Sequence, residues 1–471
     1  MTMTRLWTRR ELLKQSGCGF GSLALSGMLA NVARAASTTP GSRQPHFPPR
    51  AKRVIFLFMA GGPSQPDLFD EKKLLIKKHG EPVSPPVDGR EVSVGVDKYL
   101  ALGPAAPIRP RGESGMTISD LMPHLAKVAD DLCLLRAVHT DNEAHAPATL
   151  QLHTGVGIDV RPSMGAWLSY GLGTENENLP SFISIHAPSD VRTYGAGFLP
   201  AAHQGTPVIV PKSPQDSAIK HLIDPQTSAA QQRRRLDMIQ RLNQRLLNRV
   251  ASDQQMEGMI ESFELAFRMQ AEAPKLVDLS NESQSTQMLY GIGQPPTDRN
   301  GRACLLARRL SEAGVRFVQV TIDGWDHHDD IRGALPRQCL GSDQPVAALI
   351  QDLKARGLLE DTLVVWTGEF GRTPWSQDLS GKNPIDKHGR EHQPESFCTW
   401  LAGGGVKAGL TYGETDDFGF RPVAGKVHLH DLHATMLHLL GLDHERLTFP
   451  HHGRDYRLTD VFGEVVNEVL A

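Results

Sequence analysis

The sequence predicts an α/β protein, a three-layer α/β/α sandwich built on a mostly parallel central sheet. Two observations lead to this prediction. Short apolar segments rich in β-branched and aromatic residues occur at 53–59, 132–136, 315–321 and 361–366, and such continuous runs are typical of strands buried on both faces. Polar loops and then helical patterns follow them, so the recurring unit is strand, loop and helix. We expect these four segments to share one sheet.

The loop at 321–330, directly after the third strand, combines acids with imidazoles. Asp323 and His327 are four residues apart, so one turn of irregular chain can direct both toward one ion. Ligands of α/β proteins bind at the carboxyl ends of strands. Carboxylate oxygens and neutral imidazole nitrogens are the usual ligands of zinc and similar cations. The stretch therefore indicates a metal site, and the alternative interpretation is a solvated acidic loop with incidental histidines.

Two other loops carry candidate site residues. Three histidines follow the second strand at one loop-to-helix junction: His139, His145 and His153. A lone histidine is more often structural, whereas three beside a strand end favour a site. The loops after the fourth strand contain Glu369 and Arg372, and then His388 and His392.

Residues 214–290 change to strong helical character. The segment 233–250 is basic and amphipathic, with basic residues alternating with apolar ones and acids following. We expect peripheral helices here, forming an insertion at about 214–300, rather than a nucleic-acid-binding helix.

Composition excludes some classes of partner. The 471 residues carry 50 Lys and Arg against 53 Asp and Glu, a net charge of -3, so the totals give no electrostatic signature of nucleic-acid or anionic-lipid binding. Twenty histidines against six tyrosines is a biased count, and histidine is the commonest metal ligand. No GxGxxG or Walker pattern follows a strand, which disfavours a nucleotide-binding fold.

The first 36 residues have the pattern of a twin-arginine signal peptide. Arg9 and Arg10 precede a glycine-rich apolar run at 17–30, and Ala33-Arg34-Ala35 offers a small-x-small cleavage site. The run is too short for a spanning helix. We expect residues 1–36 to be a signal, 37–50 a flexible lead-in, and 51–471 one domain. This organisation predicts a periplasmic or secreted protein with no stable membrane span after signal removal.

Several motifs together resemble one known family. They are the twin-arginine leader and the stretches 58–64 (FMAGGPS), 324–327 (GWDH), 368–374 (GEFGRTP) and 389–392 (GREH). The combination resembles the domain-of-unknown-function family 1501 (DUF1501), which is placed in the alkaline-phosphatase/sulfatase-like superfamily. The resemblance covers nearly the whole chain.

The resemblance implies a half-site for metal. Phosphatases of the superfamily carry Asp-x-x-x-His as ligands of one ion, which Asp323 and His327 match, and a later histidine that His392 matches. Glu369 corresponds to an acid of the second site, to which Asp67 adds if its loop folds back. We therefore expect a site for one divalent ion, zinc-like or calcium, rather than a site for two ions. Asp326 and His328 should point elsewhere or orient the ligands.

The same comparison marks departures from the superfamily. Gly61 and Gly62 stand where sulfatases carry two metal-binding acids, and Phe370 replaces an imidazole. His145 occupies the slot of the catalytic nucleophile, while Ser64 and Thr149 are candidate nucleophiles only by nearness. Two residues, Arg372 and His388, are candidates to hold an anionic substrate.

Three functions follow from this pattern. The first is an exported metal-dependent hydrolase of sulfate or phosphate esters, acting on an anionic ester or a polysaccharide-type small substrate. The second is a non-catalytic binding or surface protein that kept the fold and lost the nucleophile and the second metal site. The third uses His145 directly as a covalent nucleophile.

Overall fold

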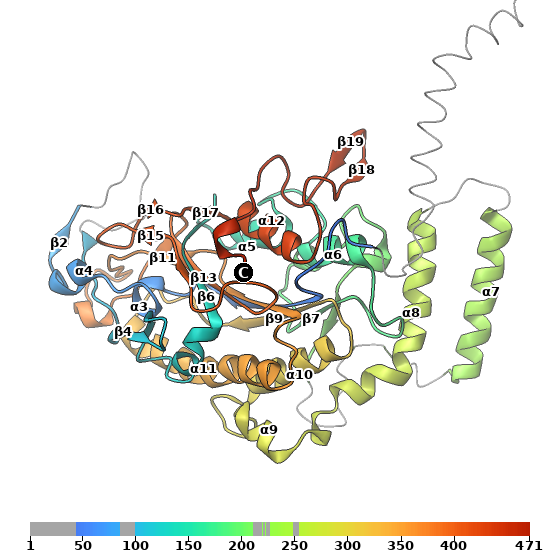
Figure 1. Ribbon diagram of the computed structural model, residues 1–471, viewed down its shortest axis with the longest axis horizontal. Helices are drawn as coiled ribbons and strands as arrows, with labels where there is room; N and C mark the ends of the chain where they lie inside the picture. The colour runs from blue at the N-terminus through green and yellow to red at the C-terminus, as the bar shows by residue number, and fades with distance from the viewer. Residues whose placement is uncertain (1–43, 85–98, 211–218, 220–221, 223–226, 248–253) are drawn as a thin grey trace, which may run out of the picture.

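The computed structural model describes residues 44–84, 99–210, 219, 222, 227–247 and 254–471 (Figure 1). The expected signal peptide and residues 37–43 of the expected lead-in lie outside the described residues. Among the helices of the described residues, none combines the length and the apolar character needed to cross a bilayer.

A nine-stranded sheet forms the centre of the fold. Its order is β14 (Thr411–Tyr412), β6 (Leu132–His139), β13 (Phe397–Ala402), β10 (Thr362–Thr367), β1 (Arg53–Ala60), β9 (Phe317–Asp323), β7 (Phe182–Ile185) and β8 (Thr206–Val208), with β17 (Val427–His428) also beside β6. Every pairing is parallel except those of β13, which runs antiparallel to β10 and β6. The four segments predicted to be strands lie in β1, β6, β9 and β10, so the prediction of one shared, mostly parallel sheet is confirmed.

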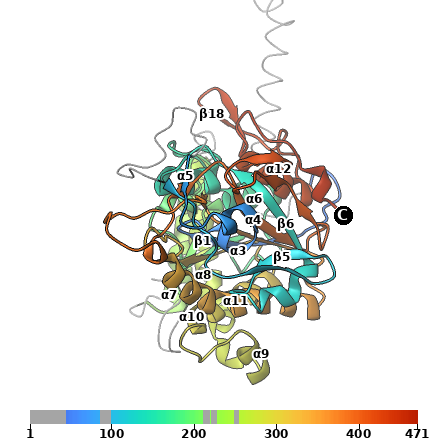
Figure 2. The same ribbon diagram turned by 90° about the vertical axis from the view of Figure 1, so that its left-hand side faces the viewer.

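Helices cover both faces of this sheet (Figures 1 and 2). Alternate residues of β1 divide between two cores, because successive side chains of a strand point to opposite faces. Ile55, Leu57 and Met59 pack with α10 (Asp298–Glu312) and α11 (Ile331–Ala355). The intervening residues of β1 pack with α6 (Met164–Leu172) and α12 (Leu429–Leu439). The result is the three-layer sandwich predicted from the sequence.

The described part of the stretch 214–290 contains helices at the periphery of the molecule (Figure 1). These are α7 (Ala229–Leu247), α8 (Gln254–Val277) and α9 (Gln284–Leu289). In Figure 1, α8 lies between the sheet and α7, so α7 is the outermost element at that end.

Short elements complete the described chain. They are the helices α3 (Gln65–Leu68), α4 (Lys73–Lys77) and α5 (His145–Thr154), and the paired strands β2 (Pro82–Val83) with β3 (Tyr99–Leu100), β4 (Ile108–Arg111) with β5 (Met116–Ser119), β11 (Gly371–Arg372) with β12 (His392–Gln393), β15 (Glu414–Thr415) with β16 (Pro422–Ala424), and β18 (Phe449–His451) with β19 (Arg454–Tyr456).

The carboxyl ends of β1, β9 and β10 meet at one edge of the sheet. These strands are parallel neighbours in register, with Ala60 opposite Asp323 and Phe58 opposite Thr367. The chain segments that leave the three strands therefore start side by side. The β11–β12 pair follows β10 directly and brings Arg372 opposite His392.

A buried histidine joins two helices on one face of the sheet. Nε2–H of His433, on α12, donates to the Leu152 carbonyl of α5 at 2.8 Å, while its Nδ1 is buried without a hydrogen-bond partner. Burial lowers the pKa of His433 to about 3. The unfolded chain takes up this proton near pH 6.5 and the folded chain does not, so the stabilisation is present above pH 6.5 and is lost as the pH falls toward 3.

We therefore expect the substitution His433→Gln, which keeps an N–H donor, to flatten the pH dependence of stability. Between pH 6.5 and 4 the free energy of unfolding of the wild type should fall more steeply than that of the variant, by up to about 1.4 kcal/mol per pH unit. Urea unfolding at intervals across this range measures both slopes. Parallel slopes would contradict the assignment.

Candidate metal centre

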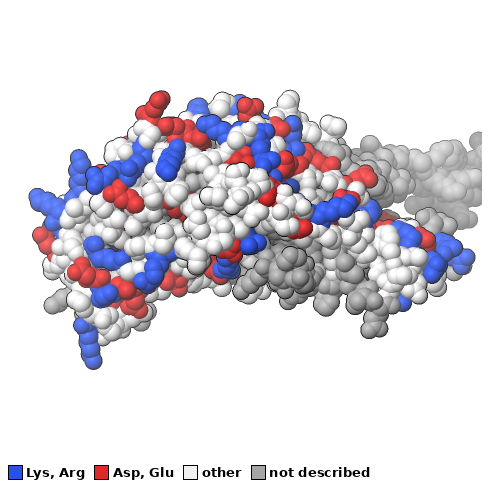
Figure 3. All heavy atoms as spheres, turned by 90° about the horizontal axis from the view of Figure 1, so that it is seen from below, with Lys and Arg blue, Asp and Glu red and all other residues white. Residues whose placement is uncertain are grey.

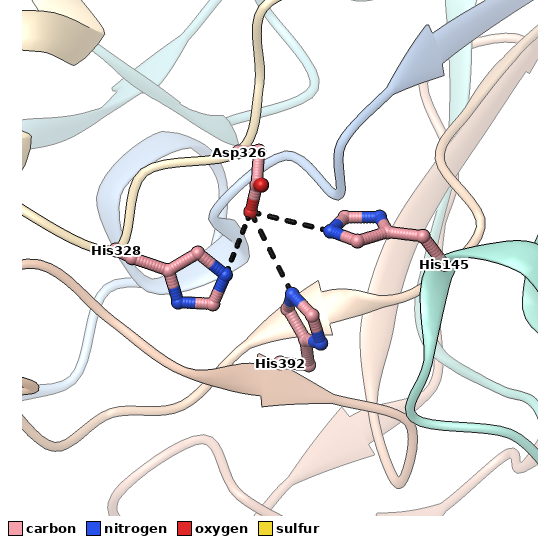
Figure 4. A group of neighbouring side chains, drawn as sticks. All are labelled: His145, Asp326, His328 and His392. Atoms are coloured by element: carbon pink, nitrogen blue, oxygen red, sulfur yellow. Dashed lines mark ion pairs between the residues drawn. The ribbon is translucent and has the colours of Figure 1, made fainter.

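Four side chains converge at the carboxyl edge of the sheet: His145, Asp326, His328 and His392 (Figure 4). One candidate ligand atom from each lies within 4.8 Å of all the others. Oδ1 of Asp326 is 2.9 Å from Nε2 of His328, 3.3 Å from Nε2 of His145 and 3.6 Å from Nε2 of His392. His145 is the first residue of α5, Asp326 and His328 follow β9, and His392 begins β12.

The second ring nitrogen of each histidine is held by an acceptor on the outer side. Nδ1–H of His145 donates to Oε1 of Glu369 at 2.7 Å, and Nδ1–H of His392 donates to the carbonyl of Glu143 at 2.7 Å. Neither acceptor has a proton to give, so both rings carry the proton on Nδ1. Their Nε2 atoms are thereby directed toward the centre, as the partners behind metal-bound histidines usually arrange.

His328 is fixed in the same way through an amide. Its Nδ1 is 2.6 Å from Oε1 of Gln377, whose Nε2 donates to the carboxylate of Glu391. A carboxylate only accepts, so the amide nitrogen faces Glu391 and the amide oxygen faces His328. The ring therefore donates from Nδ1 and also presents Nε2 inward.

This donor set fits a transition-metal ion. Nε2 of His145 and Nε2 of His392 are buried and have no hydrogen-bond partner, which is costly unless something binds them. Three imidazole nitrogens and one carboxylate oxygen are ligands suited to zinc and other borderline ions, whereas calcium and magnesium prefer oxygen.

A close approach of two backbones positions Asp326. Gly61, just after β1, has φ of 117°, and a Cβ built there would lie 2.5 Å from the backbone nitrogen of Asp326 and 2.8 Å from the carbonyl carbon of Trp325. The amide of Trp325 donates to the Ala60 carbonyl at 3.2 Å. The Trp325 side chain is fully buried against Trp366. Only glycine permits this contact, which turns Asp326 toward the site.

Arg372 ties the same segments together. Nε donates to the carbonyl of Gly62 and Nη1 to that of Arg390, each at 3.0 Å, and Nη2 donates to the carbonyl of Gly61 and to Oδ1 of Asp326. The guanidinium is fully buried. The role predicted for Arg372, binding an anionic substrate, does not fit a group whose donors are committed to backbone and to Asp326.

Phe370 packs against two of the imidazoles. Its ring stacks on His392 at 4.3 Å between centroids and lies 4.9 Å from His145. A Cβ at Gly62 would lie 2.6 Å from this ring. Gly62 and Phe370 therefore fit one another, and the Phe370 ring restricts the rotation of the two histidines.

The carboxylate of Asp326 changes the proton affinities of the group. Burial raises its pKa, but the neighbouring imidazoles of His145, His328 and His392 and the guanidinium of Arg372 outweigh this and leave the pKa well below its usual range. Burial lowers the pKa of His145, but the nearby carboxylates of Asp326 and Glu369 dominate and raise it to about 9. The bond to Asp326 raises the pKa of His328, whereas burial lowers that of His392.

The expected convergence of Asp323 and His327 with His392 requires correction. Asp323, the last residue of β9, is more than half exposed and accepts from Arg299 at 3.0 Å. His327 is buried, its Nδ1 has no hydrogen-bond partner, and burial lowers its pKa to about 4. Neither belongs to the converging group. Because Trp325 enters the core, the loop presents Asp326 and His328 instead.

Other predicted site residues also lie differently from expectation. Glu369 does not join the cluster; it orients His145 and accepts the Gly61 amide at 3.0 and 3.1 Å. His145, expected to occupy the position of a nucleophile, presents a candidate ligand atom to the group. His388 is directed away, with Nε2 2.9 Å from the Asn383 carbonyl. Asp67 is buried in an ion pair with Arg390 at 2.7 Å and also accepts from Ser64.

Sequence reasoning missed Asp326 and His328 as candidate ligands. The signal that identifies them is Trp325 between Gly324 and Asp326, because a large apolar side chain in a polar loop must be buried. Burying it fixes the direction in which its neighbours point.

Comparison with known proteins gives one family match. The sequence model of the family described as "Protein of unknown function (DUF1501)" matches residues 51–470. Among curated proteins, none matches the sequence.

Solved structures resemble the chain only remotely. One is the lipoteichoic acid synthase LtaP from Listeria monocytogenes, with 11% identity, a TM-score of 0.37, and coverage of 91% of this chain and 80% of that one. Another is the PsFucS1 sulfatase from Pseudoalteromonas sp., with 14% identity, a TM-score of 0.36, and coverage of 91% and 72%. A third is alkaline phosphatase from the Antarctic bacterium TAB5, with 9% identity, a TM-score of 0.32, and coverage of 84% and 99%.

We expect Gly61→Ala to displace Asp326 and abolish metal binding by the purified protein. Gly115→Ala is the matched control, because Gly115 also has a positive φ, of 70°, but a Cβ there would meet no atom within 4 Å. The control should lose only about 1–2 kcal/mol of stability from backbone strain. Metal content and urea unfolding of both variants test this. Normal metal content in the Gly61 variant would contradict the positioning role.

Proposed function

We propose that this chain, which belongs to the DUF1501 family, is an exported metal-dependent hydrolase of sulfate or phosphate esters. One observation carries the proposal: three histidine Nε2 atoms and the Asp326 carboxylate converge at the carboxyl edge of the sheet, with each ring locked from behind. Such preorganisation of candidate ligands by hydrogen bonds is typical of metal centres.

A single zinc-type ion fits the proposal better than calcium, because three of the four candidate ligands are imidazoles. His145, Asp326, His328 and His392 would hold it. When bound, such an ion polarises an ester oxygen and lowers the pKa of water so that it can attack near neutral pH.

The protein residues around the centre have separate tasks in this proposal. Glu369, Gln377 and the Glu143 carbonyl keep the three rings in the tautomer that leaves Nε2 free. Arg372 holds the Asp326 carboxylate in place. The side chains of Asp326 and His145 are 45% and 38% exposed, which leaves an open side for a substrate.

The nucleophile in this proposal is a water molecule. His145, in the nucleophile slot of the superfamily, has Nδ1 bound to Glu369 and Nε2 directed at Asp326. This geometry favours a ligand role over covalent attack by the histidine.

The second candidate is a non-catalytic binding protein built on the same centre. Arg372 favours it, because its donors are occupied by carbonyls and by Asp326. An anionic ester would then depend on the metal alone for its oxyanion. Export rests on the twin-arginine pattern at Arg9 and Arg10, and cell fractionation tests it.

We expect Asp326→Asn to abolish stoichiometric metal content and Asp323→Asn to leave it unchanged. The two aspartates lie three residues apart in one loop, so they are matched in position and charge, but only Asp326 contacts the histidines. Elemental analysis of protein purified from an exporting host measures metal content. Equal metal loss in both variants, or in neither, would contradict the assignment.

A panel of sulfate and phosphate esters then separates the two functions. The hydrolase is supported if the metal-loaded protein hydrolyses an ester, the Asp326→Asn variant loses this activity and the Asp323→Asn variant keeps it. Full metal occupancy without turnover on any ester favours the binding protein.

A further inference from the structure

The outer face of α7 combines arginines with exposed apolar side chains. Successive residues of a helix are about 100° apart around its axis. By this spacing, eight side chains of α7 lie within an arc of about 160°, which we call the α7 face. They are Gln231, Arg234, Arg235, Met238, Ile239, Arg241, Leu242 and Arg245. All are exposed, and no acid occurs among them. Met238, Ile239 and Leu242 are 59%, 37% and 53% exposed.

The opposite side of α7 is already occupied. Leu236 is buried, and Arg233 forms ion pairs with Asp237 and with Glu264 of α8. Gln240 also donates to Glu264. The single acid described on α7 is therefore turned toward this internal contact, and the charge left on the α7 face is positive.

We propose that the α7 face binds the surface of a membrane rich in anionic phospholipids. The four arginines would pair with lipid phosphates, which guanidinium groups recognise well. Met238, Ile239 and Leu242 would enter the boundary between headgroups and acyl chains, as the apolar side chains of basic amphipathic helices do.

The position of α7 suits this role. It is the outermost element at its end of the molecule, with α8 between it and the sheet (Figure 1). Figure 3 shows Lys and Arg atoms beside uncharged atoms and a few Asp and Glu atoms at that end. The net charge of -3 is an average over the chain and conceals this local basic face.

The apolar residues distinguish a lipid surface from other anionic partners. Nucleic-acid phosphates would pair with the arginines but would leave Met238, Ile239 and Leu242 in water. A solvated helix face would have no need of three large apolar side chains between its charges.

Vesicle co-sedimentation tests the proposal with the mature full-length chain. The probes are phosphatidylcholine vesicles with and without one quarter phosphatidylglycerol, at low and at physiological salt. Binding should require phosphatidylglycerol and weaken with salt. Replacing Arg234, Arg241 and Arg245 by glutamine should reduce the partition coefficient by about a hundredfold, and M238S/L242S should also reduce it.

Two control variants and a check of folding show whether a loss of vesicle binding is specific to the α7 face. K73Q/K77Q/K382Q removes the same charge from exposed lysines elsewhere and should bind vesicles as the wild type does. Asp326→Asn should also bind normally, because the metal centre takes no part. All substituted side chains, Asp326 included, lie on exposed surface, and circular dichroism checks that each variant is folded.

Several outcomes would overturn the proposal. They are binding independent of phosphatidylglycerol, equal loss in the lysine control, and full binding by M238S/L242S. Tighter binding to duplex DNA than to vesicles, unaffected by M238S/L242S, would assign the face to nucleic acid. Self-association that the arginine substitutions abolish, without vesicle binding, would assign it to a second copy.

Discussion

The contact between the backbone of Gly61 and that of Trp325–Asp326 sets the geometry on which the candidate centre depends. It brings the ends of β1 and β9 closer than any side chain at Gly61 would allow. The buried Trp325 prevents the loop from rotating. Once these two constraints are in place, Asp326 has one direction available, and the three histidines arrange themselves around its Oδ1.

Polar groups buried behind the centre make this arrangement stable. Arg372 and Arg390 are fully buried, and burying a charge is costly unless it is paired and hydrogen-bonded. Arg390 meets this requirement with Asp67 and with carbonyls of Leu102 and Thr373. Arg372 meets it with Asp326 and with backbone carbonyls on both sides of the site. Removing either partner leaves a charge unpaired, so these residues connect loop positions that are distant in sequence.

The fold can be predicted from the sequence more completely than the geometry of the site. Apolar runs such as 53–59 identify buried strands because a strand in a parallel sheet is covered on both faces, and the carboxyl edge then follows from topology. The position of His145 after a predicted strand and the resemblance of His392 to a ligand histidine of the superfamily are enough to place both near the site. The spacing of Asp323 and His327 favours Asp323 over Asp326, but spacing along a loop does not specify side-chain direction. The tertiary burial of Trp325 decides it, and the carbonyl partners of Arg372 come from segments 310 and 18 residues away.

The glycines at the end of β1 determine what kind of centre this edge can hold. Gly61 presents a backbone N–H, and that N–H binds Glu369. The carboxylate of Glu369 is thereby held behind His145 and orients its ring. Phe370 packs on His145 and His392, beside the space that Gly62 leaves open. Together these residues preorganise a set of nitrogen ligands around a single carboxylate, which favours one transition-metal ion over oxygen-bound ions.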